Sequence, residues 1–474
     1  MSYSKDTMSK LNEALILQPL KISDGHRKKQ IEDKLIGLYI DGPTVSRIRD
    51  IFMQELRSGL KGETSAMLML NTFISQLPDD SEEGQFLALD LGGTNFRVLH
   101  VMLEKGQIVD EQSESYHIEN ELRVGRGTDL FDFIAKCISS FLQKYQLTNK
   151  KLPLGFTFSF PMKQTSLSSA QLLMWTLSFS ASGVEGEDVV KLLTEALERN
   201  NLSNVSVVAI INDSTGTLLH GVLKDRNTNL GVILGTGTNG CYWENTDNVP
   251  HWGYKERGIK QVAVNTEWGC IADTGLLDFV KTPYDEQVDQ NSVVKNICVF
   301  EKFTGGGFLG ELVRYALVDL ANSGLIFEGT ITSKLLNEDS FPSSFITEVE
   351  KDSMEKVTTR TEEILKNYDQ SYSQDDVAVL KYLCEMVSKR AALLISICCA
   401  EVLKYMNKPK NTVAVDGSFY KYHPRIRLWM NDFVSIMAPD HKCNFIEADD
   451  GSGKGAAIAA AVALKLQQHS SETA

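Results

Sequence analysis

Two stretches of this chain share one unusual order of residues. Each has an apolar run, a short glycine turn with threonine and asparagine, and a second β-rich run. The first reads FLALDLGGTNFRVLHVM over residues 86–102, and the second reads GVILGTGTNGCYW over residues 231–243. This order is typical of a β-hairpin. Glycines also let such a turn expose backbone N–H groups that can hold phosphate oxygens. Each turn alone is therefore either a plain hairpin turn or a phosphate loop.

The repetition of this pattern predicts two related α/β halves, each pointing a loop at one shared cleft. A chain of 474 residues is long enough for two or more domains. We place the boundary near Leu218, so that residues 1–217 form an N-terminal domain with N-terminal helices and residues 218–474 form a larger C-terminal domain. We expect residues 1–25 to be loosely ordered and the final helix, 453–467, to pack back on the first domain. A ligand held from both sides predicts domain closure.

Charge and cysteine content exclude several classes of partner. The net charge of −14 argues against nucleic acid and anionic membranes. The eight cysteines form no CxxC pair, which favours reduced thiols in a cytosolic protein. The first 25 residues hold no apolar signal-peptide core, and the uncharged stretch Ala391 to Ala400 is too short to span a bilayer. We expect a cytosolic protein without membrane insertion.

Polar residues at the ends of expected strands are candidates for binding a small polar substrate. They are Ser159, Thr176, Asn212, Asp213, Asn239, Glu267 and Glu301. Asp213 is the best candidate for a base, because it follows the β-branched run Val205 to Ile211 and a carboxylate there can accept a hydroxyl proton. The alternative is that Asn212 and Asp213 only cap the next helix.

Four glycine-containing turns are candidates for holding a nucleotide. They lie at residues 90–95, 235–239, 416–418 and 451–453, and Asp90 stands where a strand enters the first of them. The chain has no G-x-x-x-x-G-K-[ST] sequence and no protein-kinase motifs, and no G-x-G-x-x-G opens a helix. These absences exclude a P-loop protein and a protein kinase, and they weaken a Rossmann interpretation.

From about residue 30 to 466 the chain resembles the hexokinase family. The resemblance rests on eight motifs in order: LALDLGGTNFRVL (87–99), LGFTFSFP (154–161), INDSTGT (211–217), LGTGTNGCY (234–242), NTEWG (265–269), FEKFTGGGFLGE (300–311), VAVDGSFYKYHP (413–424) and DGSGKGAA (450–457). The chain looks most like the single-unit eukaryotic enzymes of this family.

The resemblance implies an α/β fold of two actin-like (ribonuclease H-like) domains, with mixed sheets flanked by helices, closing around a central cleft. It implies phosphorylation of the 6-hydroxyl of glucose and related hexoses with MgATP, the first step of glycolysis, by a protein that we expect to be a monomer. Asp213 resembles the general base and Asp90 the residue that holds Mg²⁺ through water. The implied sugar contacts are Ser159, Phe160, Thr176, Asn212, Asp213, Asn239, Glu267 and Glu301. The implied nucleotide contacts are Asp90, Leu91, Gly92, Gly93, Thr94, Asn95, Arg97, Gly235, Thr236, Gly237, Thr238, Asp416, Gly417, Ser418, Gly451 and Ser452.

Three segments depart from the family pattern. Leu177 stands where the family reads lysine in T-K-G-F, and we consider Lys163 as its replacement. Residues 294–298 read VKNIC where the family often has N-P-G-x-Q, so one glutamine contact is lost. Residues 336–339 read LNED where the family often has K-T-R-G, which places acidic residues near the adenosine pocket. We therefore expect lowered activity or a shifted sugar preference. A sugar-binding sensor without turnover and a structural ATPase of the actin-like group stay open as alternatives.

Overall fold

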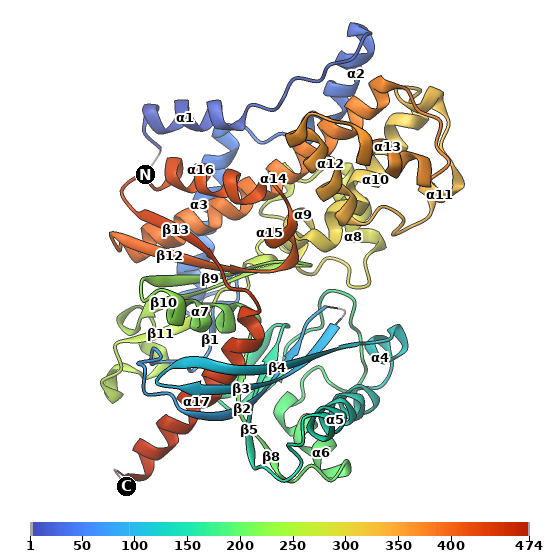
Figure 1. The fold of residues 1–474 in the computed structure, drawn as a ribbon. Helices are drawn as coiled ribbons and strands as arrows, with labels where there is room; N and C mark the ends of the chain where they lie inside the picture. The colour runs from blue at the N-terminus through green and yellow to red at the C-terminus, as the bar shows by residue number, and fades with distance from the viewer. Residues whose placement is uncertain (1–2, 94, 473–474) are drawn as a thin grey trace.

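The computed structural model describes residues 3–93 and 95–472 and contains two mixed β-sheets, each flanked by helices (Figure 1). The first sheet has the order β4-β3-β2-β5-β8. Its strands are β2 (Gly84–Leu91), β3 (Asn95–Glu104), β4 (Gln107–His117), β5 (Leu152–Phe158) and β8 (Val205–Ile211). The second sheet has the order β1-β11-β10-β9-β12-β13. Its strands are β1 (Leu70–Asn71), β9 (Thr228–Leu234), β10 (Thr238–Asn245), β11 (Gln261–Asn265), β12 (Lys410–Asp416) and β13 (Lys442–Glu447).

The two sheets repeat one topology. In the first, β2, β3 and β4 form an antiparallel meander, and β5 and β8 then add parallel to β2. In the second, β9, β10 and β11 form the meander, and β12 and β13 add parallel to β9. The two glycine turns thus occupy equivalent places, between β2 and β3 and between β9 and β10. The expected α/β class with two related halves is confirmed.

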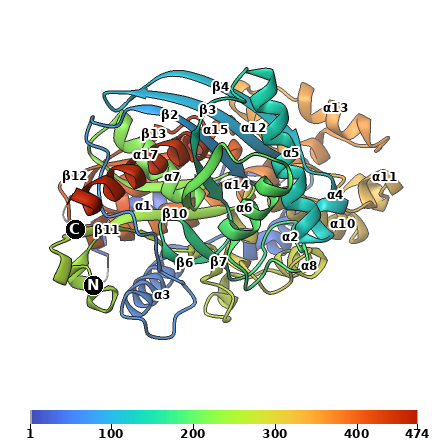
Figure 2. The ribbon, with the colours of Figure 1, turned by 90° about the horizontal axis from the view of Figure 1, so that it is seen from below.

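Two helices lie between the sheets. They are α7 (Asp213–Lys224), which follows β8, and α17 (Gly451–Glu472), which follows β13. They pack side by side in Figures 1 and 2 and share a buried cluster with residues of both sheets, including Ala88, Leu218, Cys241 and Ala460. The outer face of the first sheet is covered by α4 (Asn120–Val124), α5 (Gly127–Lys144) and α6 (Val189–Arg199).

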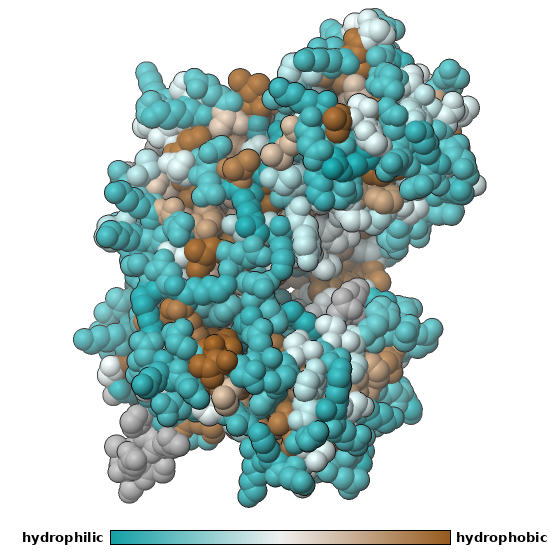
Figure 3. Space-filling view, viewed as in Figure 1, coloured by the Kyte–Doolittle hydropathy of each residue, from teal (hydrophilic) through white to brown (hydrophobic). Residues whose placement is uncertain are grey.

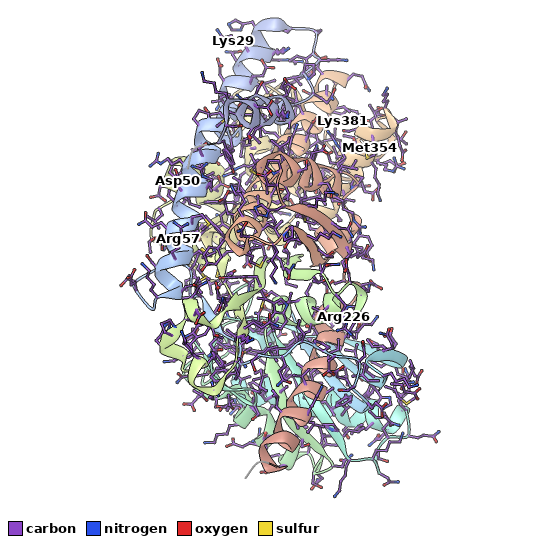
Figure 4. The ribbon with its side chains drawn as sticks, turned by 90° about the vertical axis from the view of Figure 1, so that its left-hand side faces the viewer. Lys29, Asp50, Arg57, Arg226, Met354 and Lys381 are labelled. Atoms are coloured by element: carbon purple, nitrogen blue, oxygen red, sulfur yellow. The ribbon has the colours of Figure 1, made fainter. Side chains whose placement is uncertain are left out.

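The N-terminal helices pack with the second sheet rather than the first. They are α1 (Lys5–Leu15), α2 (Gly25–Leu35) and α3 (Gly42–Leu60), and their buried side chains belong to the large core of the second half. Figure 4 shows α3 along the side of the molecule, with Asp50 and Arg57, and Lys29 on α2 above it. The expectation that residues 1–25 are loosely ordered is wrong for α1. Its start is capped by the Ser4 side chain, and Leu11 and Leu15 are buried.

The other helices of the second half surround the long helix α14. They are α8 (Pro283–Asn291), α9 (Val299–Thr304), α10 (Gly306–Asn322), α11 (Ser333–Leu336), α12 (Ser343–Glu355), α13 (Thr359–Asn367), α14 (Gln374–Met406), α15 (Ser418–Tyr422) and α16 (Ile426–Met437). Strands β6 (Met162–Ser166) and β7 (Ser169–Leu172) form a small ribbon. The 3-10 helices are η1 (Ile36–Leu38), η2 (Thr246–Asn248), η3 (Pro250–Trp252), η4 (Lys255–Arg257), η5 (Trp268–Cys270), η6 (Asp278–Val280) and η7 (Phe327–Gly329). Within the described ranges we find no helix with the length and apolar character that a bilayer crossing requires.

The chain passes between the halves three times: before β2, through α7, and before α17. Arg226, just after α7, contacts the segment before β2, where it donates to the Pro78 carbonyl and pairs with Asp80. Figure 4 labels Arg226 at the level where the halves meet. The short connections leave both glycine turns facing one region between the sheets.

Candidate active site

A cavity of about 110 Å³ lies between the two halves and is lined by residues of both. Figure 3 shows the molecular surface hollowed between its upper and lower parts, on the right of the view. The first half contributes Ser159, Thr176, Asn212 and Asp213, and the second contributes Asn239, Glu267 and Glu301. Seven of the eight substrate contacts predicted from the sequence thus lie around one cavity, although they come from segments more than 100 residues apart.

Phe160 is the exception. Its ring is fully buried and packs against Phe158, Trp175 and Phe179, at centroid distances of 4.8, 4.7 and 5.0 Å. Its neighbours Ser159 and Pro161 line the cavity, but Phe160 does not. The ring of Phe160 therefore supports the cavity wall from behind, and a contact between Phe160 and the substrate stays a prediction.

Asp213 stands at the junction of a strand and a helix. Strand β8 ends at Ile211, Asn212 caps α7 by accepting the N–H of Ser214 (2.9 Å), and Asp213 opens the helix. One carboxylate oxygen of Asp213 accepts the same N–H at 2.8 Å. Burial, with a smaller contribution from the charges of Asp90 and Asp416, raises the pKa of Asp213 to about 7, and a hydrogen bond from Ser159 opposes the shift. Asn212 therefore caps α7, and the neighbouring Asp213 has a raised carboxylate pKa, so helix capping does not exclude a role as a base.

An asparagine network joins the two halves under the cavity floor. The Asn239 side chain donates to Asn265 (2.9 Å) and to Asn212 (3.2 Å). Asn265 in turn donates to Glu267 at 2.7 Å. Sequence reasoning missed Asn265, although its position at the end of β11, two residues before Glu267, is the same signal that identified the others. This network orients Glu267 and fixes the relative place of Asn212 and Asn239.

Glu267 approaches the cavity just before η5 and Glu301 from the first turn of α9, and residues with left-handed backbone geometry lie beside both. Glu267 has a φ of 51°, and two other cavity-lining residues, Leu177 and Cys298, have φ values of 58° and 50°. Non-glycine residues rarely adopt this region, and such positions gather at functional sites. Glu301 accepts the N–H of Thr238 at 3.0 Å. A side chain at Gly237 would collide with Glu301, since its Cβ would lie 1.9 Å from Oε2.

The cavity carboxylates have raised pKa values. Burial, together with the negative charge of Asp213, raises the pKa of Glu267 to about 7 and that of Glu301 to about 8. No lysine or arginine is among the described residues that line the cavity. The nearby Lys302 is buried and pairs with Asp289 at 2.5 Å. A cavity of this kind favours a neutral ligand with several hydroxyl groups, which can donate to the carboxylates.

A second group of carboxylates surrounds Arg97 at the β2–β3 hairpin. Arg97 pairs with Asp90 and with Asp450, the latter at 2.5 Å, and Ser452 donates to Asp90 at 2.8 Å. Asp416 accepts the N–H of Ser452 at 3.1 Å. Burial raises the pKa of Asp450 to about 6, and Arg97 opposes this shift. Three of the four turns predicted to hold a nucleotide therefore meet here: 90–95, 416–418 and 451–453.

The glycine turns of the two halves face each other. A Cβ on Gly93 would lie 3.6 Å from Thr236 and 3.4 Å from Leu177, and Gly235 lies close to Gly417. Within the second turn, Gly235 donates to the Gly237 carbonyl (3.0 Å) and Thr238 donates to Glu301, so these N–H groups are already engaged. Thr236 is exposed.

The remaining predicted nucleotide contacts take different positions. The side chain of Leu91 is buried in the first core, and only its carbonyl is used, accepting from Ser159 (3.2 Å). Gly92 lines the cavity, and Ser418 is exposed at the start of α15. Thr94 and the side chain of Asn95 lie outside the described residues.

A larger groove of about 520 Å³ adjoins the cavity and shares Gly93, Leu177 and Thr236 with it. Glu338 and Asp339 line this groove, and the place of the acidic segment near the adenosine pocket stays a prediction. Leu177 lies at the boundary between groove and cavity. Lys163 is exposed on β6 and lines neither, so it does not replace the lysine missing at Leu177.

Known proteins similar to this chain agree with the resemblance seen in the sequence. Two sequence models of the hexokinase family match residues 30–223 and 229–462. Human Hexokinase-1 is 38% identical over 453 residues, which cover 93% of this chain and 49% of that protein. Human Hexokinase-3 is 39% identical over 451 residues, covering 93% of this chain and 48% of that protein. The chain thus spans about half the length of the curated relatives it matches.

Solved structures extend the comparison to the fold. A Schistosoma mansoni hexokinase complexed with glucose is 37% identical, with a TM-score of 0.87 over 93% of this chain and 100% of that one. A second hexokinase crystal structure is 29% identical, with a TM-score of 0.74 over 93% of this chain and 100% of that one. These matches confirm the predicted α/β fold of two actin-like domains. On sequence and structure together, this chain belongs to the hexokinase family.

Proposed function

We propose that this protein is a hexose kinase, which transfers the γ-phosphoryl group of ATP to the 6-hydroxyl of D-glucose or a related hexose. The observation that carries the proposal is the small cavity between the halves, where three carboxylates, one buried and two half-buried, and two asparagines have no cation among the described lining residues. Hydroxyl groups of a neutral sugar satisfy such a set. The family relatives named hexokinase, one of them complexed with glucose, support the same substrate class.

In this proposal the sugar is held from both halves. Ser159, Thr176 and Asn212 supply contacts from the first half, and Asn239, Glu267 and Glu301 supply contacts from the second. Each charged hydrogen bond to a hydroxyl contributes about 1.5–3 kcal/mol. Because the contacts come from both halves, binding favours their approach, and closure excludes water that would otherwise accept the phosphoryl group.

Asp213 is the proposed general base. With a pKa of about 7, it is substantially ionised at neutral pH and basic enough to accept a proton from the 6-hydroxyl. The O–H bond then breaks as the hydroxyl oxygen bonds to the γ-phosphorus, and the bond from phosphorus to the bridging oxygen of ADP breaks. Alignment of these groups supplies most of the acceleration in phosphoryl transfer.

The donor set around Arg97 fits a nucleotide with a divalent cation. Asp90, Asp416 and Asp450 are carboxylates crowded around one arginine, and oxygen ligands of this kind suit Mg²⁺. Asp90 would hold the metal, which when bound supplies neutralisation of the phosphate charge. We assign the adjoining groove, with Thr236 and Ser418 beside the phosphates, to the nucleotide.

We keep the two-domain division near Leu218 as a proposal, with one change. The packing of α1, α2 and α3 in the core of the second half favours assigning them to that domain. The packing of α17 against β2 and β5 favours the expected return of the final helix to the first domain. That the protein is a cytosolic monomer stays a prediction, which cell fractionation and sedimentation velocity test.

A sugar-binding sensor is the second candidate, because Leu177 replaces a cation at the boundary of cavity and groove. Calorimetric titration with glucose and ATP, run beside a coupled turnover assay with glucose, mannose and fructose, separates the two. A kinase binds sugar and releases hexose phosphate, whereas a sensor binds sugar without turnover. ATP hydrolysis without any sugar dependence would contradict both and favour a structural ATPase.

A further inference from the structure

Two cysteines of the second half approach each other beside the cavity. The Sγ atoms of Cys270 and Cys298 are 3.1 Å apart. Both side chains are buried, with exposed fractions of 3% and 5%, and both thiols are free. A disulfide bond is about 2.05 Å long, so a movement of about 1 Å would bring the sulfurs to bonding distance.

Each cysteine belongs to a segment that holds one of the cavity carboxylates. Cys270 ends η5, three residues after Glu267, and Cys298 immediately precedes α9, three residues before Glu301. Cys298 itself lines the cavity and adopts the left-handed backbone region. It also ends the segment 294–298, where the chain departs from the family pattern. The cysteine pair therefore lies between η5, which follows Glu267, and α9, which carries Glu301.

A third side chain fixes this arrangement. The two carboxylate oxygens of Asp273 accept the N–H groups of Cys298 and Val299, at 3.0 and 2.8 Å. One ligand atom from each of Cys270, Asp273 and Cys298 lies within 4.8 Å of the others, as in a metal donor set. Because both oxygens of Asp273 are engaged in holding the loop, the group functions better as a clamp on Cys298 than as a metal ligand. The clamp leaves the two sulfurs facing each other at 3.1 Å.

We propose that Cys270 and Cys298 are a redox modification site, a dithiol that a two-electron oxidant of the peroxide class converts to a disulfide. One sulfur loses its proton and attacks a peroxide oxygen; the O–O bond breaks, giving a sulfenic acid and hydroxide, which takes the proton to become water. The other thiol sulfur then attacks the sulfenic sulfur, the S–S bond forms, the S–O bond breaks and a second water leaves. The two thiols are oxidised by two electrons and the peroxide is reduced.

The cavity is the route by which the oxidant reaches the pair, because Cys298 lines it while Cys270 lies behind. A disulfide would link the η5 segment after Glu267 covalently to the start of α9, and it would shift both carboxylates. It follows, resting on the proposed function, that bound hexose slows the oxidation and that oxidation lowers turnover until a thiol reductant restores it.

The test treats the full chain with hydrogen peroxide, blocks remaining thiols with iodoacetamide under denaturing conditions, and maps the peptides by mass. We expect a peptide pair linked through Cys270 and Cys298, released by dithiothreitol. Cys270→Ser and Cys298→Ser should each abolish it. Cys443→Ser is the matched control, because Cys443 is the one cysteine of the chain that is not fully buried, and it should keep the link. Absence of the linked pair while Cys443 is oxidised would overturn the proposal.

Two further measurements keep the test decisive if a variant folds poorly. The unchanged chain should bind one equivalent of phenylarsine oxide, a reagent for close dithiols, and binding of none would also overturn the proposal. Saturating glucose should lower the yield of linked peptide. Equal yields with and without glucose, in a protein that phosphorylates glucose, would contradict the route through the cavity. A linked peptide without any hexose turnover would contradict the proposed function and leave the dithiol standing.

Discussion

Two groups of buried carboxylates face the region between the sheets, and their surroundings differ. Asp213, Glu267 and Glu301 line the small cavity, hold raised pKa values and have no cation among the described lining residues. Asp90, Asp416 and Asp450 gather at the turns around Arg97, which pairs directly with two of them. One group has an arginine in direct contact with two of its carboxylates, and the other has no cation among the described lining residues.

The difference indicates which ligand each group receives. A carboxylate that is shielded from water and has no cation beside it costs free energy in the folded protein. A polyhydroxyl ligand lowers that cost by donating hydrogen bonds. The group around Arg97 already has a cation, so it suits a ligand that brings further negative charge with its own metal. We therefore divide the cleft into an acid-lined sugar site and an arginine-centred phosphate site. Each of the following variants tests this division.

The largest expected effect comes from Asp213→Asn. The amide keeps the size of the side chain and removes its ability to accept a proton, so kcat for hexose phosphorylation should fall by about 10²–10⁴-fold. Asp225→Asn, at the other end of α7, is the matched control, since its carboxylate accepts from Thr412 and Asn227 far from the cavity. A kcat for Asp213→Asn near that of the unchanged chain would remove Asp213 as the base.

Arg97→Met should destabilise the protein strongly. It leaves the buried carboxylates Asp90 and Asp450 without their cation, and the free energy of unfolding should fall by about 2–4 kcal/mol. Urea denaturation measures the change. Arg226→Met removes a more exposed pair with Asp80 and should cost under about 1 kcal/mol. Equal losses of unfolding free energy in the two variants would show that the ion pairs of Arg97 stabilise the protein no more than a surface ion pair does.

The cavity carboxylates predict a pH dependence of stability. Their folded pKa values, about 7 for Asp213 and Glu267 and about 8 for Glu301, lie above those of the unfolded chain. The folded state therefore holds more protons between about pH 5 and pH 8, and the free energy of unfolding should fall as the pH rises through this window.

Glu301→Gln removes one of these carboxylates, so the free energy of unfolding should fall less steeply with pH. At pH 8 the sugar-free variant should be more stable than the unchanged chain by on the order of 1 kcal/mol. Urea titrations of both chains at pH 5 and pH 8 give the comparison. A variant less stable than the unchanged chain at pH 8 would show that Glu301 has a partner that relieves its charge.

Leu177→Lys is the one variant expected to raise activity. A cation at the boundary of cavity and groove would stabilise charge on the transferring phosphoryl group, and we expect turnover to rise about tenfold. Leu173→Lys, at an exposed position of the same segment, controls for added charge. Turnover of the unchanged chain equal to or above that of Leu177→Lys would contradict the hypothesis of lowered activity.

Some residues of the two carboxylate groups could be predicted from local sequence pattern, and others could not. Asp213 and Asn212 were found from the sequence because a β-branched strand followed by Asn-Asp defines its own geometry. Glu267 and Glu301 were also candidates from their positions, but only the family resemblance indicated that these two distant segments meet at one site.

The features missed by sequence reasoning had different causes. Asn265 carries the same strand-end signal as the other candidates and was overlooked, and its bond to Glu267 shows its place in the site. The pairing of Arg97 with Asp450 joins segments from the two halves, which no local pattern records. For Phe160, its place in the motif does not show which way the ring points, and the structure places the ring behind the cavity wall. Helix α1 was missed because a mostly polar segment is held by few buried residues, chiefly Leu11 and Leu15.

The most direct test of the central claim follows a mixture of the chain, glucose and MgATP by ³¹P nuclear magnetic resonance. If the acid-lined cavity holds a hexose and Asp213 accepts the proton of its 6-hydroxyl, the resonances of glucose 6-phosphate and ADP should rise together in equal amounts. Unchanged ATP, or conversion of ATP to ADP and inorganic phosphate without any sugar phosphate, would contradict the account.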